Sequence, residues 1–238
     1  MPGAAGTVAF VDMDSTVPIT CTPAYDAPVD AAVLIPIKAF TQAKGRLRPV
    51  LTPEHREQLA RWTAERVLSA AGELPVFVVC DDAAVAAWAV AHGAEVLWQR
   101  DQGLNGAVDN AVSLLSDAGH RHVIVVHGDL PRPGSLAAFA HADTVTLVPD
   151  RRLDGTNVLS FPVHPGISAT YGAGSFRRHL AAAMQTGCAV EVVRDRFMAL
   201  DIDHPIDLTH PLVKDVLPPW LTLLTTNPAN PANPPSAA

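Results

Sequence analysis

Three aspartates stand out because each one follows or closes an apolar stretch. Asp129 comes directly after the run VIVVHG at 123–128, whereas Asp201 and Asp203 lie two residues apart in ALDIDHP. On extended backbone, residues two apart point the same way, and two carboxylates on one face repel each other unless a cation or water lies between them. If all three converge, their hard oxygen atoms suit Mg²⁺, which shares its coordination shell with substrate phosphates. The alternative is that Asp203 only helps to start a helix and Asp129 only holds a turn.

A basic segment follows the first apolar run of the central chain. The sequence PIKAFTQAKGRL at 36–47 carries Lys38, Lys44 and Arg46. Two lysines and an arginine near the end of a strand are able to hold a triphosphate. The segment lacks both the GxxxxGK[ST] pattern of a P-loop and the GxGxxG turn, so an ordinary solvated basic loop remains the alternative.

A glycine-bearing loop reads YGAGSF at 171–176. Gly172 and Gly174 allow the main chain to approach a ligand closely. Ser175 can open a helix whose first N–H groups attract an anion. A plain glycine turn followed by a helix N-cap would explain the same residues without any ligand.

Two further loops carry polar groups at the boundaries of predicted elements. In DGTNVL, Thr156 precedes a strand and can donate a hydrogen bond to a carboxylate or a phosphate. In QGLNGAV, Gly103 and Asn105 stand at the start of a helix, where they can contact a base edge or a ribose. A plain turn and a helix N-cap are the alternatives.

Strands and helices alternate along the chain and set the positions of these loops. Apolar runs predict strands at 32–37, 76–80, 94–98, 123–127, 144–148, 157–161, 190–193 and 197–202. Capping residues and glycines predict helices from Pro53 to about Ala71, from Asp82 to Gly93, over 105–118, from Ser175 to Gly187, and from Pro205 onward. This order predicts an α/β fold with a mostly parallel sheet covered on both faces. Ligands bind beyond the carboxyl ends of such strands, which is where Asp129 is expected.

The composition of the chain argues against some classes of binding partner. The 238 residues carry a formal net charge of −7 without a lysine or arginine tract, which argues against nucleic acid or an anionic membrane as a partner. The three cysteines are far apart and form no CxxC motif, a pattern typical of a reducing compartment. The sequence shows no signal peptide and no stretch long enough to cross a membrane. We therefore expect a cytoplasmic protein.

The ends of the chain differ from its centre. Residues 1–30 are rich in aspartate and proline without a period, and we expect them to form an N-terminal extension. Residues 218–238 become rich in proline, asparagine and alanine, and we expect a disordered C-terminal tail. One domain is expected between them, over 31–217.

Taken together, six motifs in register resemble one known family. They are IPIKAFTQAKGRL, GLNGAV, HGDLP, DGTNVL, YGAGSFRRH and LDIDHPIDL, spread from about Val33 to Leu208. The chain resembles the 2-phospho-L-lactate guanylyltransferases of coenzyme F420 biosynthesis, whose actinobacterial members are phosphoenolpyruvate guanylyltransferases. The resemblance implies a single Rossmann-like nucleotidyltransferase domain, with a mixed, mostly parallel sheet, related to the GT-A glycosyltransferases.

The resemblance also implies roles for the residues singled out above. It implies that the Mg²⁺ ligands are Asp129, Asp201 and Asp203, and that Asp129 and Lys38 are the catalytic residues. It implies that Lys38 and Thr156 hold the carboxylate of a small phosphorylated acid, and that Gly172 and Ser175 contact its phosphate. It implies that Lys44 and Arg46 bind the phosphates of GTP, with Gly103 and Asn105 near the nucleoside.

The implied reaction fits these residue types. A phosphate oxygen of the acid attacks the α-phosphorus of GTP, and pyrophosphate leaves. A phosphate monoester is already largely ionised near neutral pH, with a second pKa of about 6, so no general base is required. Metal ions and basic side chains align two anions that repel each other. We expect phosphoenolpyruvate as the acid, and we expect the product to pass to the next enzyme of the pathway.

Three other classes of protein remain open. A molybdenum-cofactor guanylyltransferase would have the same fold but usually opens with a glycine-rich LxxGxGxRM-like loop, where this chain reads PIKAFTQAKGRL. A GT-A glycosyltransferase would use an acidic pair to bind a sugar nucleotide. A module that binds nucleotides without catalysis would pass any binding test but release no pyrophosphate.

Overall fold

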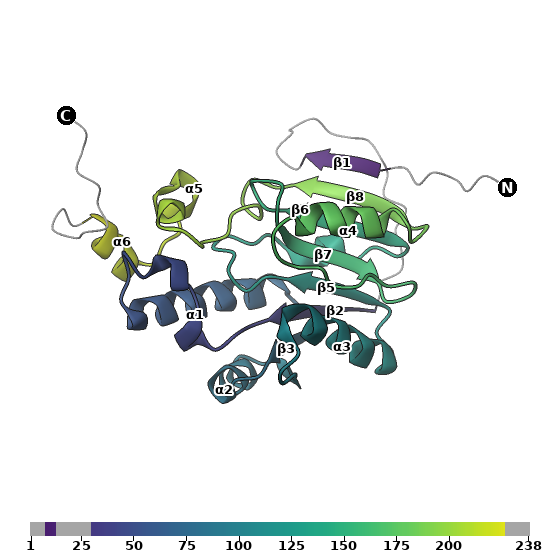
Figure 1. Ribbon diagram of the computed structural model, residues 1–238, viewed down its shortest axis with the longest axis horizontal. Coiled ribbons are helices and arrows are strands. Elements are labelled where there is room, and N and C mark those ends of the chain that lie inside the picture. The colour runs from purple at the N-terminus through teal and green to yellow at the C-terminus, as the bar shows by residue number, and fades with distance from the viewer. Residues whose placement is uncertain (1–7, 13–29, 227–238) are drawn as a thin grey trace.

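The computed structural model describes residues 8–12 and 30–226, which form one α/β domain around an eight-stranded sheet (Figure 1). The strands are β1 (Val8–Asp12), β2 (Ala31–Pro36), β3 (Val76–Cys80), β4 (Glu95–Trp98), β5 (His122–Val126), β6 (Thr144–Pro149), β7 (Thr156–Pro162) and β8 (Ala189–Arg194). The α-helices are α1 (Pro53–Ala70), α2 (Ala83–Ala91), α3 (Gly103–Asp117), α4 (Ser175–Ala183), α5 (Pro211–Lys214) and α6 (Pro219–Thr226). Short 3₁₀ turns are η1 (Phe40–Gln42), η2 (Gly45–Leu47), η3 (Leu136–Phe139) and η4 (Pro205–Thr209).

The sheet is mixed and mostly parallel, as predicted. Its strand order is β1-β8-β6-β7-β5-β2-β3-β4, and β7 is the strand that runs antiparallel to its neighbours β5 and β6. The carboxyl ends of the parallel strands therefore meet at one edge of the sheet, together with the amino end of β7. We call this edge the carboxyl edge.

Helices cover both faces because the strand residues alternate between two cores. In β2, Val33 and Ile35 pack with α1 and α2 on one face, and Ala32 and Leu34 pack with α3 and α4 on the other. Figure 1 shows α3 and α4 on the side of the sheet that faces the viewer. Strands with apolar side chains on both faces are typical of a sheet buried between two helical layers.

The structure corrects four expectations. Residues Val8–Asp12, expected in a loose extension, form β1 and pair in parallel with β8. The segment 197–202 is not a strand: the carboxylate of Asp195 accepts from the N–H groups of Phe197 and Met198 and turns the chain there. The helix that begins at Pro205 is the short 3₁₀ turn η4, and α5 follows it.

The fourth correction concerns the expected C-terminal tail, because residues 219–226 form α6. The expectations for residues 1–7, 13–29 and 227–238 fall outside the described part of the chain.

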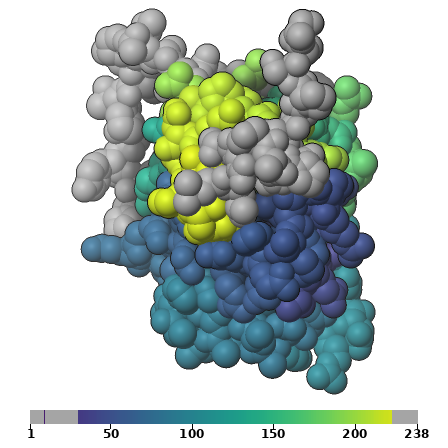
Figure 2. All heavy atoms as spheres, turned by 90° about the vertical axis from the view of Figure 1, so that its left-hand side faces the viewer, coloured from purple at the N-terminus to yellow at the C-terminus, as the bar shows by residue number. Residues whose placement is uncertain are grey.

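A third apolar cluster joins the C-terminal segment to α1 and to the loop before it. Its buried members are Leu47, Leu51, Leu59, Leu200, Ile202, Leu208, Val213, Leu217 and Leu221. Figure 2 shows the yellow C-terminal residues lying against the blue residues of this region. Ile202 is fully buried in the cluster and separates Asp201 from Asp203 in sequence. Burying Ile202 therefore fixes where its two acidic neighbours lie.

We predict that Ile202→Ala lowers the free energy of unfolding by about 2–4 kcal/mol, because it opens a cavity in this cluster. Urea denaturation measures the change. The matched control is Ile206→Ala, since Ile206 is 62% exposed in the next turn, and we expect a change within about 0.5 kcal/mol for this variant. Equal effects in the two variants would contradict the anchoring role of Ile202.

Candidate active site

Three carboxylates converge at the carboxyl edge of the sheet, as the sequence predicted. One oxygen from each of Asp129, Asp201 and Asp203 lies within 4.8 Å of the others. Asp129 sits in the turn after β5, and its carbonyl accepts a hydrogen bond of 3.4 Å from the N–H of Ile202. Although residues 201–203 belong to no strand, the buried Ile202 leaves both aspartates on the side of Asp129.

Lys44 bridges two of these carboxylates. Its Nζ atom lies 3.0 Å from Oδ2 of Asp129 and 3.3 Å from Oδ1 of Asp203, and its side chain is only 6% exposed. Arg46, which is mostly exposed, donates to the other oxygen of Asp203 at 2.9 Å. The predicted basic segment thus reaches the aspartates directly, with Lys44 in a left-handed backbone conformation at φ 55°.

The electrostatics of the three acids are unequal. Burial, together with the charges of Asp129 and Asp203, raises the pKa of Asp201 to about 7. Burial alone would also raise the pKa of Asp129, but Lys44 and His127 outweigh that effect, and the pKa of Asp129 falls below its ordinary value. Burial is the largest cause of the raised pKa of Asp201, and the two neighbouring carboxylates add to it, so a further positive charge beside Asp201 would lower this pKa.

The chemistry of the donor set fits a hard divalent cation. Within the described residues, Oδ1 of Asp129 is buried without a hydrogen-bond partner. An orphaned carboxylate oxygen beside two further carboxylates offers the oxygen ligands that Mg²⁺ prefers. The charge of such a cation would also relieve the repulsion that raises the pKa of Asp201.

Asp207 holds this part of the site in place and was missed from the sequence. Its carboxylate is nearly fully buried and accepts from the backbone N–H groups of Asp203 at 3.0 Å and His204 at 2.6 Å. Arg151 donates to the other oxygen of Asp207. The repeated aspartate in LDIDHPIDL was the available signal, since Asp207 lies four residues after Asp203.

Thr156 begins β7 at the carboxyl edge, and a buried histidine orients its hydroxyl. The N–H of Thr170 donates to Nε2 of His179 at 2.9 Å, and Nδ1 of His179 lies 3.0 Å from Oγ1 of Thr156. Burial, with the charges of Arg178 and His127, lowers the pKa of His179 to about 4, so the ring is neutral at pH 7. The neutral ring then carries its proton on Nδ1 and donates it to Thr156. The hydroxyl hydrogen of Thr156 is left to donate to another group.

Tyr171 connects this threonine to the acidic cluster. Its ring packs edge to face between the rings of His127 and His179, with centroid distances of 4.9 and 4.8 Å. Burial lowers the pKa of His127, and the charge of Lys44 lowers it further, while Asp129 and Asp203 oppose the shift. The two histidines and Tyr171 were not predicted as site residues.

The YGAGS loop differs from its prediction in detail. Gly174, not Ser175, is the N-cap of α4, and Ser175 is a buried residue of the first turn. The N–H groups of Gly174 and Phe176 both donate to Asp154, and the N–H of Ser175 donates to the carbonyl of Gly172. These first N–H groups of α4 are therefore already satisfied. Gly172 has a φ of 114°, a conformation that favours glycine.

Asn105 is bonded to the glycine-bearing loop. It lies inside α3 and is not its N-cap. Its Oδ1 accepts from the N–H of Tyr171 at 2.7 Å, and its Nδ2 donates to the carbonyl of the same residue at 3.3 Å. Asn105 therefore fixes the YGAGS loop against α3, and its predicted place near the nucleoside stays a prediction.

Two adjoining cavities lie along the carboxyl edge. The larger one, of about 220 Å³, is lined by residues that include Lys38, Lys44, His127, Asp129 and Asp203. The smaller one, of about 100 Å³, has Gly103 in its wall. The two cavities share Pro36, Ile37, Lys38 and Leu104. The structure thus brings Lys38 and Lys44 together with Asp129 and Asp203, whereas Gly103 lies in the adjoining cavity.

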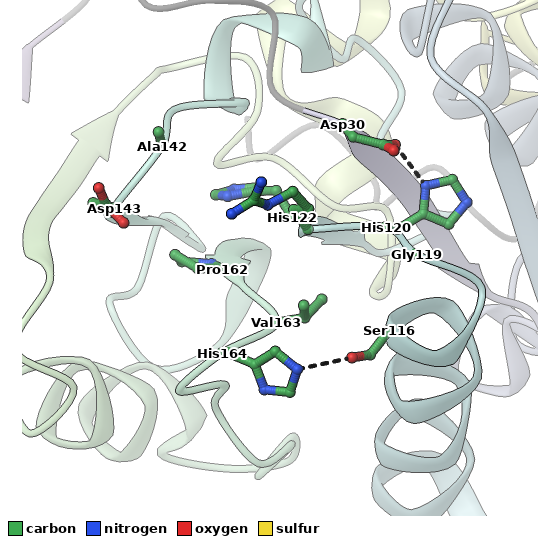
Figure 3. A pocket seen from close by; sticks show the side chains of 11 residues that line it. Asp30, Ser116, Gly119, His120, His122, Ala142, Asp143, Pro162, Val163 and His164 are labelled. Atoms are coloured by element: carbon green, nitrogen blue, oxygen red, sulfur yellow. Dashed lines mark hydrogen bonds and ion pairs between the residues drawn. The ribbon is translucent and has the colours of Figure 1, made fainter.

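A third cavity, of about 580 Å³, is formed by different residues (Figure 3). In its wall His120 pairs with Asp30 at 2.8 Å, and His164 lies 3.2 Å from Ser116. His122, at the start of β5, shows that this cavity lies at the opposite edge of the sheet. None of the predicted site residues lines it, and the greater volume alone does not make it the better candidate for catalysis.

Solved structures with the same fold define the class of this domain. One, described as a candidate nucleotide-diphospho-sugar transferase from Desulfovibrio desulfuricans G20, covers 84% of this chain and 90% of its own, with a TM-score of 0.63 and 15% identity. A nucleotidyl transferase from Methanothermobacter thermautotrophicus covers 75% of this chain and 94% of its own, with a TM-score of 0.53 and 16% identity. The fold is the GT-A-like fold of nucleotidyltransferases, as predicted.

Sequence comparison then identifies the family. The family model described as "Guanylyl transferase CofC like" matches residues 31–214. The phosphoenolpyruvate guanylyltransferase of Chloroflexus aggregans is 35% identical over 185 residues, covering 72% of this chain and 91% of the relative. The 2-phospho-L-lactate guanylyltransferase of Methanothermobacter thermautotrophicus is 30% identical over 187 residues, covering 74% of this chain and 81% of the relative. The chain belongs to the CofC-like guanylyl transferase family.

Over 8–12 and 30–226, every helix is too short or too polar to cross a bilayer.

We predict that Asp201→Asn stabilises the metal-free protein, and more so as the pH rises. In the native protein Asp201 keeps its proton up to about pH 7, whereas in the unfolded chain it loses the proton near pH 4. The folded state therefore binds more protons over this window, and the unfolding free energy falls as the pH rises through it. Asparagine removes this penalty, so the difference between variant and native protein grows from pH 5 to pH 7 and then levels.

Thermal unfolding in a chelating buffer measures this difference, and Asp117→Asn at the exposed end of α3 is the control. Adding Mg²⁺ is expected to stabilise the native protein more than the Asp201→Asn variant. A pH-independent difference would contradict the burial and crowding inferred for Asp201.

Proposed function

We propose that this protein transfers GMP from GTP to the phosphate of a small phosphorylated carboxylic acid, with release of pyrophosphate, in coenzyme F420 biosynthesis. The observation that carries the proposal is the convergence of three carboxylates, with Lys44 and Lys38, at the edge where Thr156 offers a hydroxyl donor. Nucleotide and acid are both polyanions. Joining them requires a site that concentrates positive charge and holds both ligands in line.

In this proposal Asp129, Asp201 and Asp203 hold Mg²⁺. When bound, the cation neutralises charge on the phosphates and polarises the α-phosphorus of the nucleotide. Lys44 already places its ammonium group within 3.3 Å of two of these acids. Lys44 and Arg46 are therefore positioned to bind the triphosphate next to the cation.

We assign the phosphorylated acid to the side of the site formed by Lys38 and Thr156. Lys38 is exposed in the wall of the larger cavity, so its ammonium group is available for a carboxylate. The Thr156 hydroxyl keeps its hydrogen for an acceptor, because its lone pair accepts from His179. Gly172 and Ser175 are proposed to contact the phosphate of the acid. Because the first N–H groups of α4 are engaged, this contact would depend on the loop main chain before Gly174 and on the Ser175 hydroxyl.

The proposed reaction uses no general base from the protein. The attacking oxygen belongs to a phosphate monoester that is largely ionised near neutral pH. His127 and His179 serve as neutral packing and hydrogen-bonding groups, since burial lowers the pKa of each of them. Catalysis then depends on the alignment of the two anions by Lys38 and by the cation that Asp129 would hold.

The acceptor is proposed to be phosphoenolpyruvate, with 2-phospho-L-lactate as the second candidate. Relatives with 31–35% identity carry the phosphoenolpyruvate name, and two at 30% carry the 2-phospho-L-lactate name. The two acids have the same carbon skeleton and differ only where phosphoenolpyruvate has C=CH₂ and 2-phospho-L-lactate has CH–CH₃, and a pocket discriminates such small groups by only about 1–3 kcal/mol.

Pyrophosphate release with GTP and Mg²⁺ tests the function, with phosphoenolpyruvate, 2-phospho-L-lactate and 3-phosphoglycerate offered separately. Release with one of the first two acids supports the proposal and names the acceptor. Folded protein that binds GTP but releases no pyrophosphate with any of them would refute it.

We predict that Asp129→Asn lowers pyrophosphate release by about 100-fold or more, because a site without this ligand loses several kcal/mol of charge stabilisation. Asp143→Asn, outside the acidic cluster and in the wall of the third cavity, is the matched control and is expected to retain activity. Circular dichroism verifies that both variants fold. Full activity of Asp129→Asn would contradict the proposed role of this residue.

We predict that Thr156→Val raises the KM for the phosphorylated acid by about 10- to 100-fold, because it removes one hydrogen bond to a charged group. The KM for GTP is expected to change little. Thr156→Ser keeps the hydroxyl and should remain close to the native protein. Steady-state kinetics with each substrate varied in turn separates these cases, and equal changes in both KM values would argue against acid binding by Thr156.

A further inference from the structure

We infer that Asp81 and Gln99 recognise the base of the nucleotide and select guanine by its Watson–Crick edge. This inference rests on the proposed function, since it assigns the smaller cavity at the carboxyl edge to the base of GTP. It concerns two residues that follow neighbouring strands, Asp81 after β3 and Gln99 after β4. Both line the smaller cavity.

The smaller cavity has the position that a base requires. It continues from the larger cavity through the shared Pro36, Ile37, Lys38 and Leu104, so phosphates beside the acidic cluster would lead the nucleoside into it. Its remaining walls include the apolar side chains of Val79 and Ala107. Apolar walls with a few polar groups among them suit a heterocycle whose edge carries donors and acceptors.

Asp81 is the carboxylate that is available at this rim. The adjacent Asp82 is engaged, because its Oδ1 caps α2 by accepting from the N–H groups of Ala84 and Val85 at 3.0 Å each. Among the described residues, the carboxylate of Asp81 has no hydrogen bond or ion pair, and the residue is exposed. Asp82 thus has a structural role as a helix cap, whereas the carboxylate of Asp81 can accept hydrogen bonds from a ligand.

Gln99 presents the complementary donor. Its Oε1 accepts a hydrogen bond of 3.3 Å from Nδ2 of Asn110, which leaves the amide NH₂ group to donate. The N–H of Gln99 bonds to the carbonyl of Cys80 at 2.9 Å, so the backbone ties Gln99 to the residue before Asp81. The backbones of Asp81 and Gln99 therefore leave neighbouring strand ends, and both residues line the same cavity.

This pair matches guanine and mismatches adenine. Guanine offers the O6 acceptor beside the N1–H and N2–H₂ donors, so Gln99 can donate to O6 while Asp81 accepts from N1 and N2. Adenine offers an amino group where guanine has O6 and a lone pair where guanine has N1–H. Each contact would then place donor against donor or acceptor against acceptor, so adenine would not form the hydrogen bonds that guanine forms with Asp81 and Gln99.

Isothermal titration of GTP, ITP and ATP in the presence of Mg²⁺ tests this inference on the native protein and on Asp81→Asn. ITP lacks the N2 amino group but keeps O6 and N1–H. We expect the native protein to bind GTP about tenfold more tightly than ITP and about 100-fold more tightly than ATP, because hydrogen bonds to charged groups discriminate on this scale. We expect the Asp81→Asn variant to bind GTP about 10- to 100-fold more weakly than the native protein does, so that its affinity for GTP approaches its affinity for ITP.

The matched control is Asp101→Asn, which removes the same charge from an exposed residue near Gln99. Asp101 lines neither cavity, and asparagine tolerates its φ of 59°. As a second variant, Gln99→Glu places a carboxylate against O6 and is expected to lower the affinity for GTP more than the affinity for ATP. Equal loss of base preference in Asp101→Asn, or an unchanged ratio of GTP to ITP in Asp81→Asn, would overturn the inference.

Binding and turnover separate this inference from the proposed function. If the native protein selects GTP and Asp81→Asn loses that selection while no acid gives pyrophosphate, the base assignment stands and the proposed reaction fails. If the native protein releases pyrophosphate from GTP and Asp81→Asn keeps the native base preference, the reaction stands and the assignment fails.

Discussion

The mutual repulsion of three carboxylates is the constraint on which this site depends. Asp129, Asp201 and Asp203 are brought within 4.8 Å of one another by separate parts of the chain, and burial makes their repulsion costly. Lys44 offsets part of it by pairing with two of them. Burial, together with the repulsion that Lys44 leaves uncompensated, raises the pKa of Asp201. A protein without further use for this cluster would gain stability by replacing one acid, so its presence argues for a cation and anionic ligands at this edge.

Apolar packing supplies the force that keeps these acids together. Ile202 lies in a cluster with α1 and the C-terminal helices, and Asp207 holds the backbone of Asp203 from the other side. Elsewhere in the site, neutral histidines contribute packing and hydrogen bonds instead of charge. The rings of His127 and His179 enclose Tyr171, and His179 orients the hydroxyl of Thr156. One wall of the site is therefore set by charge pairs and the other by hydrogen bonds between neutral groups.

Much of this arrangement could be predicted from the sequence, because it follows from local patterns. Apolar runs separated by capped helices predicted the layered sheet, and acids placed after apolar runs predicted the cluster. The stretch 197–202 was misjudged because its apolar residues resemble a strand, whereas the side chain of Asp195 turns the backbone. The contact of Asn105 with the backbone of Tyr171 was not predicted, because its partner is 66 residues away. The role of His179 likewise depends on tertiary contacts that no local pattern shows, whereas Asp207 bonds to residues three and four positions before it and was missed despite the repeated aspartate in LDIDHPIDL.

The reversed direction of β7 has a consequence for how such an enzyme can diversify. Because β7 runs against its neighbours, its beginning reaches the same edge as the ends of β2, β3 and β5. The residues that line the two cavities come from outside β7 and α4, while Thr156 at the start of β7 is held by His179 of α4. Substitutions in β7 and α4 can therefore alter one part of this edge without replacing any side chain that lines the cavities.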